Sequence, residues 1–333
     1  MINILLKTRF FLFLMLLSIF MWFSFNSDAE GQGYPNKPIN FMIPYGAGGT
    51  TDLTYRAFCD AASKYLGQKM VAINKAGAGG TIASMAVANS EADGYTLGGG
   101  TTSPALIAPY SEGSPYKNLD KFKFISNIGM YVYIYCVNKD APYKTWKEFV
   151  EWARANPRGA KVGMPGAVSV MAQGFAISQA AEKERISIAY VAFKSGPEVL
   201  TATLGGHISM YASTFDANIK AFIDQGKLQP LAIADMRPPG LMEYQTIPTL
   251  KDLYKLEITP NLKAIWGPHG LTNSVVKKLE GAFEQATKDS IFTTIMNNFF
   301  MPVVYMNSEE TTSFALKTFN GVGELKRKLA GQK

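Results

Sequence analysis

Three glycine-rich segments carry the clearest chemical signal in this sequence. They are Gly46-Ala47-Gly48-Gly49, Gly77-Ala78-Gly79-Gly80 and Gly98-Gly99-Gly100. Glycine allows tight turns and close approach of the backbone to a ligand, and successive free N–H groups beside a helix N-terminus attract an anion. One such segment alone is explained by turns and packing, but several at equivalent points of the chain favour a ligand. The segments therefore predict an anion site built from main-chain amides.

Asp52 follows the first glycine segment by three residues and has two interpretations. In the first turn of a helix its carboxylate would complement the helix dipole, which contributes about 0.3–1 kcal/mol at an exposed site. The same carboxylate could instead accept a hydrogen bond from a hydroxyl or amine of a ligand. Both roles remain open at this point.

Nucleotide, metal and catalytic sites lack their characteristic residues. The first segment has no third glycine of a dinucleotide fingerprint, and no segment carries Gly-Lys-Ser or Gly-Lys-Thr. The motifs of zincins, serine hydrolases and thiol redox proteins are also missing. His207 and His269 lie in glycine-containing turns, whereas a zinc or iron site needs several imidazole or thiolate ligands. We therefore expect no catalytic residue, no metal and no cofactor.

The composition is that of a folded globular chain with a mild positive charge. Of the 333 residues 47% are hydrophobic, and 33 Lys and Arg against 26 Asp and Glu give a net charge of +7. No basic run marks a nucleic-acid tail, so we expect no nucleic acid as partner and an anionic small ligand instead. Cys59 lies in a predicted helix and Cys136 in a predicted strand, and the sequence leaves open whether they pair.

A repeated pattern of strand, loop and helix positions the glycine segments. Strands are predicted at residues 39–43, 71–74 and 95–97, each followed by one glycine segment. Three such steps predict an α/β fold with a parallel sheet. In open α/β sheets ligands bind at the carboxyl ends of the strands, which is where these segments lie.

A second series of elements begins near residue 131, and the length suits two domains of about 150 residues each. Capping boxes at Thr145 with Glu148 and at Ser195 with Glu198 predict two helix starts. Further strands are predicted at residues 131–137, 161–164, 188–191, 208–212, 228–234 and 264–266, and helices at 273–288 and 308–329. The predicted lobe 1 comprises residues 30–131 and 235–333, and lobe 2 residues 132–234, with two crossings between them.

Residues 1–29 have the pattern of an export signal. Lys7 and Arg9 precede an apolar run over residues 10–25, and Ser27 and Ala29 supply the small residues of a cleavage site. We expect cleavage after Ala29 and a periplasmic protein. The run is longer than the usual signal core, so an uncleaved membrane anchor is the alternative.

The order and spacing of several short motifs resemble those of one known family. The motifs are YPNKPINFMIPYGAGGTTD at residues 34–52, LGQ at 66–68, NKAGAGG at 74–80, DGYTL at 93–97 and GKLQPLA at 226–232. Together they resemble the Bug, or tripartite tricarboxylate transporter (TctC-like), periplasmic substrate-binding proteins. The resemblance covers nearly the whole mature chain.

The resemblance implies a two-lobed, type II periplasmic-binding-protein fold, a Venus flytrap in which each lobe is a mainly parallel sheet flanked by helices. It implies a monomeric solute-binding protein that captures an organic carboxylate in the cleft between the lobes. The ligand would then pass to the membrane permease subunits of a tripartite tricarboxylate-type transporter. No covalent chemistry is implied.

Carried over by position, the resemblance implies ligand contacts from both lobes. Lobe 1 would supply Tyr45, Gly46, Ala47, Gly48, Gly49, Thr50, Asp52, Ala78, Gly79, Gly80, Thr102 and Ser103. Lobe 2 would supply Met164, Pro165, Gly166, Ser169, Phe193, Lys194 and Ser213.

The lobe 2 loop departs from the family pattern. This chain has Gly-Met-Pro-Gly-Ala-Val at residues 163–168, where the family commonly has Gly-Ser-Ser-Gly-x-Gly. Met164 and Val168 make the expected wall more apolar, which favours a ligand with a hydrophobic or aromatic body. Lys194 would either neutralise a second carboxylate or remain a solvated residue at the lip of the cleft.

Two other functions fit the same architecture, because a fold alone does not determine function. One is a membrane-tethered sensory module that uses the cleft to report a solute. The other is an enzyme, which would need a titrating group poised in the cleft. Retention of residues 1–29 favours tethering, and chemical change of a bound ligand favours an enzyme.

Overall fold

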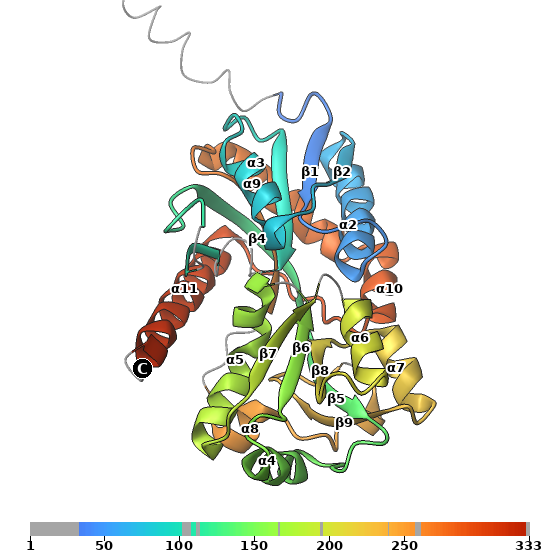
Figure 1. Ribbon diagram of the computed structural model, residues 1–333. Helices are drawn as coiled ribbons and strands as arrows, with labels where there is room; N and C mark the ends of the chain where they lie inside the picture. The colour runs from blue at the N-terminus through green and yellow to red at the C-terminus, as the bar shows by residue number, and fades with distance from the viewer. Residues whose placement is uncertain are drawn as a thin grey trace, which may run out of the picture. The chain divides into compact units, whose positions relative to one another are not determined.

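The structure is a computed structural model that describes residues 33–101, 108–110, 114–165, 167–193, 196–238, 240–256 and 261–330. The chain divides into two compact units, residues 1–36 and residues 37–333. All the helices and strands described below lie in the second unit (Figure 1). They form two five-stranded sheets flanked by helices, which confirms the predicted α/β fold.

The first sheet, the core of lobe 1, has the strand order β2-β1-β3-β10-β4. Its members are β1 (Ile39–Ile43), β2 (Met70–Asn74), β3 (Thr96–Thr101), β4 (Phe122–Tyr131) and β10 (Asn261–Pro268). β1 is parallel to β2 and β3, whereas β10 is antiparallel to both β3 and β4. Because β1, β2 and β3 run the same way, their carboxyl ends meet at one edge of the sheet.

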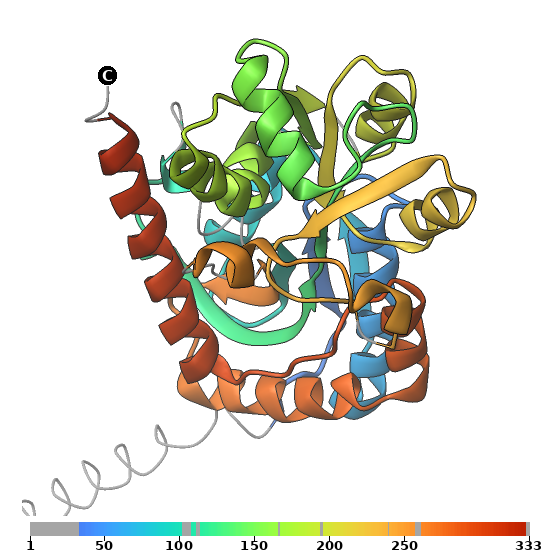
Figure 2. The same cartoon turned by 90° about the horizontal axis from the view of Figure 1, so that it is seen from below.

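Helices cover both faces of the first sheet. α2 (Thr50–Leu66) lies beside α9 (Asn273–Thr287) and α10 (Ser290–Asn298), as Figures 1 and 2 show. The ring of Phe58 in α2 lies 5.2 Å from that of Phe283 and 5.5 Å from that of Phe292. The other elements of lobe 1 are η1 (Ala78–Gly80), α3 (Thr81–Ala88), η3 (Ala108–Tyr110) and α11 (Ser308–Ala330).

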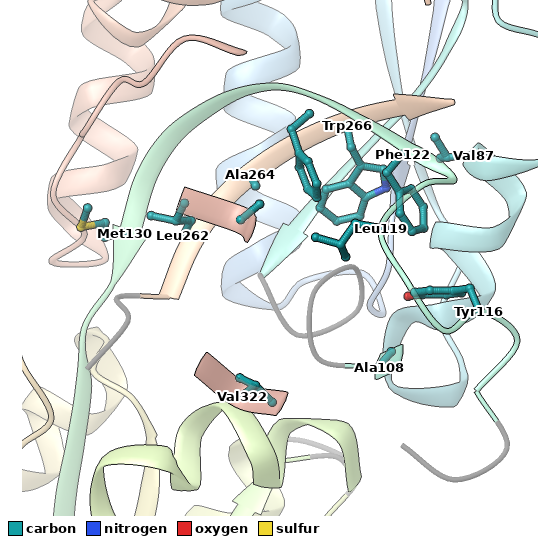
Figure 3. Close-up of a cluster of buried hydrophobic side chains, with 12 residues drawn as sticks. Val87, Ala108, Tyr116, Leu119, Phe122, Met130, Leu262, Ala264, Trp266 and Val322 are labelled. Carbon is teal, nitrogen blue, oxygen red and sulfur yellow. The ribbon is translucent and has the colours of Figure 1, made fainter. Parts of the chain in front are cut away.

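A hydrophobic cluster fills the space between β4, β10, α3 and α11 (Figure 3). Trp266 is its largest member and is 1% exposed, with Phe122 packed edge-on at 6.3 Å between ring centroids. Val87 and Leu119 belong to the same cluster. This packing ties the antiparallel strands β10 and β4 to the parallel part of the sheet.

The second sheet, the core of lobe 2, has the order β7-β6-β8-β5-β9. Its strands are β5 (Tyr133–Asn138), β6 (Lys161–Pro165), β7 (Ala189–Phe193), β8 (Met210–Thr214) and β9 (Leu228–Ile233). β6 is parallel to β7 and β8, and β5 is antiparallel to β8 and β9. The flanking helices are α4 (Trp146–Ala155), α5 (Ala167–Glu184), α6 (Gly196–Leu204) and α7 (Ala217–Asp224).

The start of α4 confirms the predicted cap at Thr145, although the Glu148 side chain bonds back to Lys144 and not to Thr145. The Thr145 hydroxyl accepts a hydrogen bond from the Glu148 amide at 3.2 Å, and the Glu148 carboxylate accepts one from the Lys144 amide at 2.6 Å. These bonds satisfy donors that a helix end otherwise leaves free. The second predicted box includes Ser195, which lies outside the described residues.

Most of β4 was not predicted from the sequence. The predicted strand began at residue 131, but strand pairing with β10 already starts at Phe122. Ser126 and Asn127 interrupt the apolar pattern of β4, and the pairing contains register shifts, so its period is not that of a regular strand. Only Val132 separates β4 from β5, and this is the first crossing between the sheets.

The second crossing begins later than residue 235, the predicted boundary of lobe 2. After β9, η4 (Met242–Tyr244) and α8 (Leu250–Tyr254) still pack on lobe 2. Ile233 forms an isolated bridge with Thr249, and the Tyr244 ring lies 4.9 Å from that of Phe215. The buried ring of Tyr244 thus keeps this segment on the second sheet before the chain returns to β10.

Candidate functional site

Two glycine segments lie at the carboxyl ends of neighbouring strands. β1 is followed by the segment Gly46–Gly49 and then α2, and β2 is followed by Gly77–Gly80 and then α3. Ile43 and Asn74, the last residues of the two strands, are register partners. The backbone turns that precede α2 and α3 therefore lie at the same edge of the first sheet, as the sequence predicted.

The first glycine segment is held in place by Asp52. One carboxylate oxygen accepts a hydrogen bond from the Gly48 amide at 2.8 Å, and the other accepts one from the Asn74 side chain at 2.8 Å and pairs with Arg56 Nε at 2.8 Å. Asn74 also donates to the Tyr45 carbonyl at 3.0 Å. Asp52 is 2% exposed, so this network lies beneath the loop and not on its open side.

These contacts bear on the two interpretations of Asp52. Burial raises the pKa of the Asp52 carboxyl. The hydrogen bonds from Arg56, Gly48 and Asn74 together lower it by more than burial raises it, so the net pKa lies below the usual value. The ionised carboxylate is thus engaged by three internal partners. These contacts support the positioning role at the start of α2, and a ligand contact by Asp52 stays a prediction.

The amides on the open side of the first loop have a different status. Within the described residues, the N–H groups of Gly46 and Ala47 meet no hydrogen-bond acceptor. Gly49 is the N-cap of α2 and offers no side chain to the first amides of the helix. Gly46, Ala47, Gly48 and Gly49 are all exposed. An anion at this point would meet free donors and the positive end of a helix dipole.

The second glycine segment presents its backbone in a left-handed turn. Gly77, Ala78, Gly79 and Gly80 have φ values of 132°, 46°, 64° and 96°. Gly80 donates to the Gly77 carbonyl at 2.9 Å, whereas the amides of Ala78 and Gly79 find no acceptor in the described part of the chain. Gly80 caps α3 without a side-chain hydrogen bond. Successive amides in such a turn form a concave donor for an anion.

The third glycine run was interpreted wrongly. Gly98, Gly99 and Gly100 lie inside β3 and not in a loop after it. A Cβ atom at Gly99 would lie 2.7 Å from Tyr55 Cε1, and one at Gly100 would lie 2.8 Å from Pro44 Cγ. These glycines let an aromatic ring and a proline pack on the sheet, so packing explains them. The sequence could not distinguish a glycine turn from a glycine strand.

Lobe 2 brings three of its predicted site residues to one sheet edge. Pro165 and Phe193, the last residues of β6 and β7, are register partners, and both are half-buried. Ser213 lies near the end of β8, with its hydroxyl 3.8 Å from the position of a Cβ at Gly196, the first residue of α6. η1 of lobe 1 contacts α5 of lobe 2, so the two lobes meet next to the second glycine segment.

The structure contradicts one part of the predicted lobe 2 wall. Met164 is fully buried, and a Cβ at Gly174 of α5 would lie 3.3 Å from its Cε atom, so its side chain packs beneath α5. Met164 therefore gives no support to an apolar ligand surface. Thr102, Ser103, Gly166 and Lys194 lie outside the described residues, as do the side chains of Val168 and Ser169.

Two hydrogen bonds near the first loop were not predicted, although Tyr45 was an expected ligand contact and Thr51 and Thr101 lie in or beside the expected site. The Tyr45 hydroxyl bonds to Thr101 Oγ1 at 3.0 Å, and Thr51 Oγ1 bonds to the Tyr131 hydroxyl at 3.1 Å. Thr101 ends β3, and Tyr131 ends β4. Only the tertiary pairing of β3, β10 and β4 brings Thr101 and Tyr131 to the start of α2, so no local pattern in the sequence marked these bonds.

Residues typical of other functional classes are not gathered at this edge. In the described ranges no cluster of three His, Cys, Asp or Glu residues is placed to hold a metal ion. Cys59 and Cys136 are both buried free thiols, in α2 and β5 respectively. No helix among the described residues is long and apolar enough to span a bilayer.

A separate cavity of about 930 Å³ lies in lobe 2, away from the glycine segments. Its lining includes Trp146 of α4, Pro230 of β9, Tyr244 of η4 and Tyr254 of α8. None of the residues predicted to bind a ligand lines it. This cavity is therefore the alternative to the glycine segments as a binding site for a small molecule.

Comparison with known proteins identifies the relatives of this chain. The family model described as "Tripartite tricarboxylate transporter family receptor" matches residues 54–330. A protein of Cupriavidus necator described as "UPF0065 protein in gbd 5'region" is 30% identical over 292 residues, covering 88% of this chain and 87% of that protein.

Solved structures share the fold over most of the chain. One described as "Structure of a periplasmic transporter" has a TM-score of 0.77 and 26% identity, covering 89% of this chain and 98% of the other. A structure of R. palustris Rpa4515 with adipate has a TM-score of 0.74 and 20% identity, covering 88% of this chain and 97% of the other. These similarities agree with the two-lobed α/β fold described above.

Proposed function

Since the chain belongs to the tripartite tricarboxylate transporter receptor family, we propose that it is an extracytoplasmic receptor that captures an organic carboxylate between its two lobes. The receptor would release the ligand to the permease subunits of a tripartite tricarboxylate-type transporter. Capture uses hydrogen bonds and lobe closure and needs no covalent step.

The observation that carries this proposal is a pair of helix starts at one sheet edge whose N-cap residues have no side chain to accept a hydrogen bond. Gly49 and Gly80 cap α2 and α3 without a side-chain acceptor, and the amides of Gly46, Ala47, Ala78 and Gly79 are free within the described residues. A carboxylate accepts from several such donors at once, and hydrogen bonds to a charged group contribute about 1.5–3 kcal/mol each. Several of them, less the cost of ordering, approach the roughly 8 kcal/mol of micromolar affinity.

For the second wall of the site we propose the strand ends of lobe 2. Pro165, Phe193 and Ser213 lie at one edge of the second sheet, and α5 beside them contacts η1 of lobe 1. Phe193 is half-buried and supplies an aromatic surface, whereas Ser213 is 4% exposed and its hydroxyl would contribute less. This arrangement suits a ligand with a carboxylate at the glycine edge and an aliphatic or aromatic body toward Phe193.

A dicarboxylate of moderate length is the first ligand to test. The related fold in R. palustris holds adipate, a six-carbon dicarboxylate. The net charge of this chain, +7, also favours an anionic ligand. We therefore propose a panel of mono-, di- and tricarboxylates from four to eight carbons, with adipate as reference and neutral adipamide as its control.

Thermal unfolding and calorimetric titration of the exported protein test the proposal. A carboxylate that binds the folded state stabilises it by about 2.7 kcal/mol at a hundredfold excess over its Kd. We expect at least one carboxylate to raise the Tm and adipamide to leave it unchanged. The proposal fails if no member of the panel raises the Tm or releases heat.

We propose that residues 1–29 direct export and are removed after Ala29. Intact mass of the protein recovered from the periplasm tests this, because cleavage leaves a chain that begins at Glu30. A mass that retains these residues would support the membrane-tethered sensory alternative. The same spectrum, recorded after incubation with adipate, would reveal covalent change, which binding alone does not produce.

We also propose that the receptor acts as a monomer and meets the permease through its two lobes together. Light scattering of the purified protein should give a single-chain mass with and without ligand. Deletion of the permease genes should abolish uptake of the ligand by cells and leave its binding to the purified receptor unchanged.

A further inference from the structure

Lys263 is the buried charged side chain without an opposite charge. Among the described residues, three charged side chains are buried: Asp52, Lys263 and Asp289. Asp52 pairs with Arg56 at 2.8 Å and Asp289 pairs with Lys64 at 2.7 Å. Lys263 is 0% exposed, and no described carboxylate lies within ion-pair distance of its Nζ atom. A buried ammonium without an anion is costly, so within the described residues Lys263 is either neutral or in need of an anion from outside them.

The surroundings of Lys263 are aromatic and uncharged. Its Nζ lies 4.2 Å from the centre of the Tyr131 ring on β4 and 4.6 Å from that of Tyr55 on α2. On β3 its register partner is Thr101, and a Cβ at Gly129 would lie 3.4 Å from its Cδ. Burial holds the pKa of Lys263 well below its usual range.

The titratable groups that face Lys263 come from three elements. Tyr131 comes from β4, Tyr55 from α2 and Tyr45 from the loop after β1, and Cys59 of α2 adjoins Tyr55. Burial raises the pKa of each of these groups, so all four remain neutral when Lys263 titrates. Among these five groups, Lys263 is therefore the one whose charge changes.

A chain of hydrogen bonds leads from Lys263 to the first glycine loop. Its ammonium donates to the Tyr131 hydroxyl at 2.8 Å, and that hydroxyl bonds to Thr51 Oγ1 at 3.1 Å. A hydroxyl that accepts from the ammonium keeps its own proton to donate onward. When Tyr131 donates to Thr51, the Thr51 hydroxyl keeps its own proton as a donor at the first turn of α2.

We propose that Lys263 is the positioning counter-charge of the bound anion, acting through Tyr131 and Thr51, so that ligand capture is coupled to uptake of a proton by Lys263. This inference rests on the proposed carboxylate site. An anion at the start of α2 stabilises the ammonium across two hydrogen bonds, and the ammonium turns the hydroxyl donors toward the anion. No bond is formed or broken apart from the transfer of one proton from solvent.

Calorimetric titration with adipate in buffers of different ionisation enthalpy measures this coupling. The slope of observed enthalpy against buffer enthalpy is the number of protons taken up. Measured from about pH 5 to pH 10, the slope should be positive and should pass through a maximum, because the bound anion raises the pKa of Lys263 in the complex. A slope of zero across this range in the wild-type protein would overturn the inference.

Variants assign the proton to Lys263. Lys263→Met should abolish the uptake and weaken adipate binding about tenfold at the acid end of this range, with the difference fading as the pH rises through the pKa of Lys263 in the complex. Lys263→Arg keeps its charge at every pH used, so it should bind adipate without proton uptake. The matched control is Lys123→Met, at the opposite end of β4 from Tyr131, which should behave like the wild type.

Tyr131→Phe tests the relay without removing the charge, and it serves if Lys263→Met does not fold. We expect it to reduce the proton uptake at least twofold, because the ammonium loses its contact with Thr51. If adipate binds and the uptake is the same in wild type, Lys263→Met and Tyr131→Phe, this inference is wrong while the proposed function stands. If no carboxylate binds at all, both are wrong.

Discussion

The helix starts of this protein fall into two groups. Among the helix starts that the structure describes, six, those of α4, α7, α8, α9, α10 and α11, have a side chain that accepts a hydrogen bond from one of the first amides of the helix. α2 and α3 carry Gly49 and Gly80 instead and have no such acceptor. α7 is the informative case, because it follows the carboxyl end of β8 and is nevertheless capped by Asp216. A place at a strand end is therefore not enough, and the glycine cap is what leaves donors for a ligand.

Giving α2 a charged cap should have the largest effect. In Gly49→Asp the new carboxylate would accept from the first amides of α2 and repel a bound anion. Gly49 has an extended backbone with φ −79° and ψ 164°, and a Cβ there would have only the Gly46 carbonyl oxygen within 4 Å, at 3.8 Å. We expect adipate to bind about 100-fold more weakly and the protein to gain a few tenths of a kcal/mol of stability.

The matched variant Gly49→Asn supplies a cap without the charge. It should stabilise the protein to a similar degree and weaken adipate binding by a smaller factor. Calorimetry and chemical unfolding measure the two quantities. Unchanged adipate affinity in Gly49→Asp would show that the start of α2 is not the anion site.

Replacing a glycine by alanine should destabilise the protein where the glycine is packed inside β3 and should have little effect where it lies in the first loop. Gly99→Ala places a Cβ 2.7 Å from Tyr55 Cε1, and we expect a loss of about 1–3 kcal/mol in the free energy of unfolding. Gly46→Ala meets no atom within 4 Å and should change stability by less than about 0.5 kcal/mol. Urea unfolding of both variants checks this, and equal losses would contradict the assignment of Gly99 to packing.

Asp52→Asn should loosen the first loop and change the acid stability. The loss of the Arg56 pair and of one hydrogen bond to Asn74 should cost about 1–2 kcal/mol, reduced by the exposure of Arg56. The lowered pKa of Asp52 means that its contribution is complete above the unfolded-state pKa of about 3.9 and is lost as the pH falls through the folded-state pKa.

The stability of the wild type should therefore drop more than that of Asp52→Asn between pH 7 and pH 3. Unfolding by urea at the two pH values measures the difference. Parallel losses in the two proteins would show that Asp52 is not held in its charged form by these partners.

Removing a cap from the other group should have the smallest effect. Thr272 accepts a hydrogen bond from the Val275 amide at the start of α9. Thr272→Ala should cost about 1 kcal/mol of stability and leave adipate affinity unchanged. A loss of affinity in this variant would mean that cap removal acts on binding through general destabilisation, and the comparison between the two groups would lose its force.

The local part of the architecture was predictable from the sequence. Each strand that precedes a glycine segment was found by its apolar pattern, and Thr145 with Glu148 marked the start of α4 because capping is a contact over three residues. β4 was missed because Ser126 and Asn127 break its apolar pattern, and η4 and α8 were placed in the wrong lobe because only tertiary packing of Tyr244 assigns them.

The part of the candidate site that consists of main-chain amides was predictable from the sequence, whereas its side-chain contacts were not. The two glycine loops follow from turn chemistry, but the internal use of Asp52 depends on Asn74, which is 22 residues away. Lys263 and Thr51 are joined through Tyr131 by strand pairing between β10 and β4. Nothing in the sequence around Lys263 shows that a lysine in a strand lacks a carboxylate partner.

The most direct test of the account is a crystal structure of the exported protein with adipate. We predict a carboxylate of adipate within about 3 Å of main-chain N–H groups in residues 46–51 or 77–81. The rest of the ligand should point toward Phe193. Adipate in the lobe 2 cavity beside Trp146 and Tyr254, with the glycine amides bonded within the chain, would contradict the account.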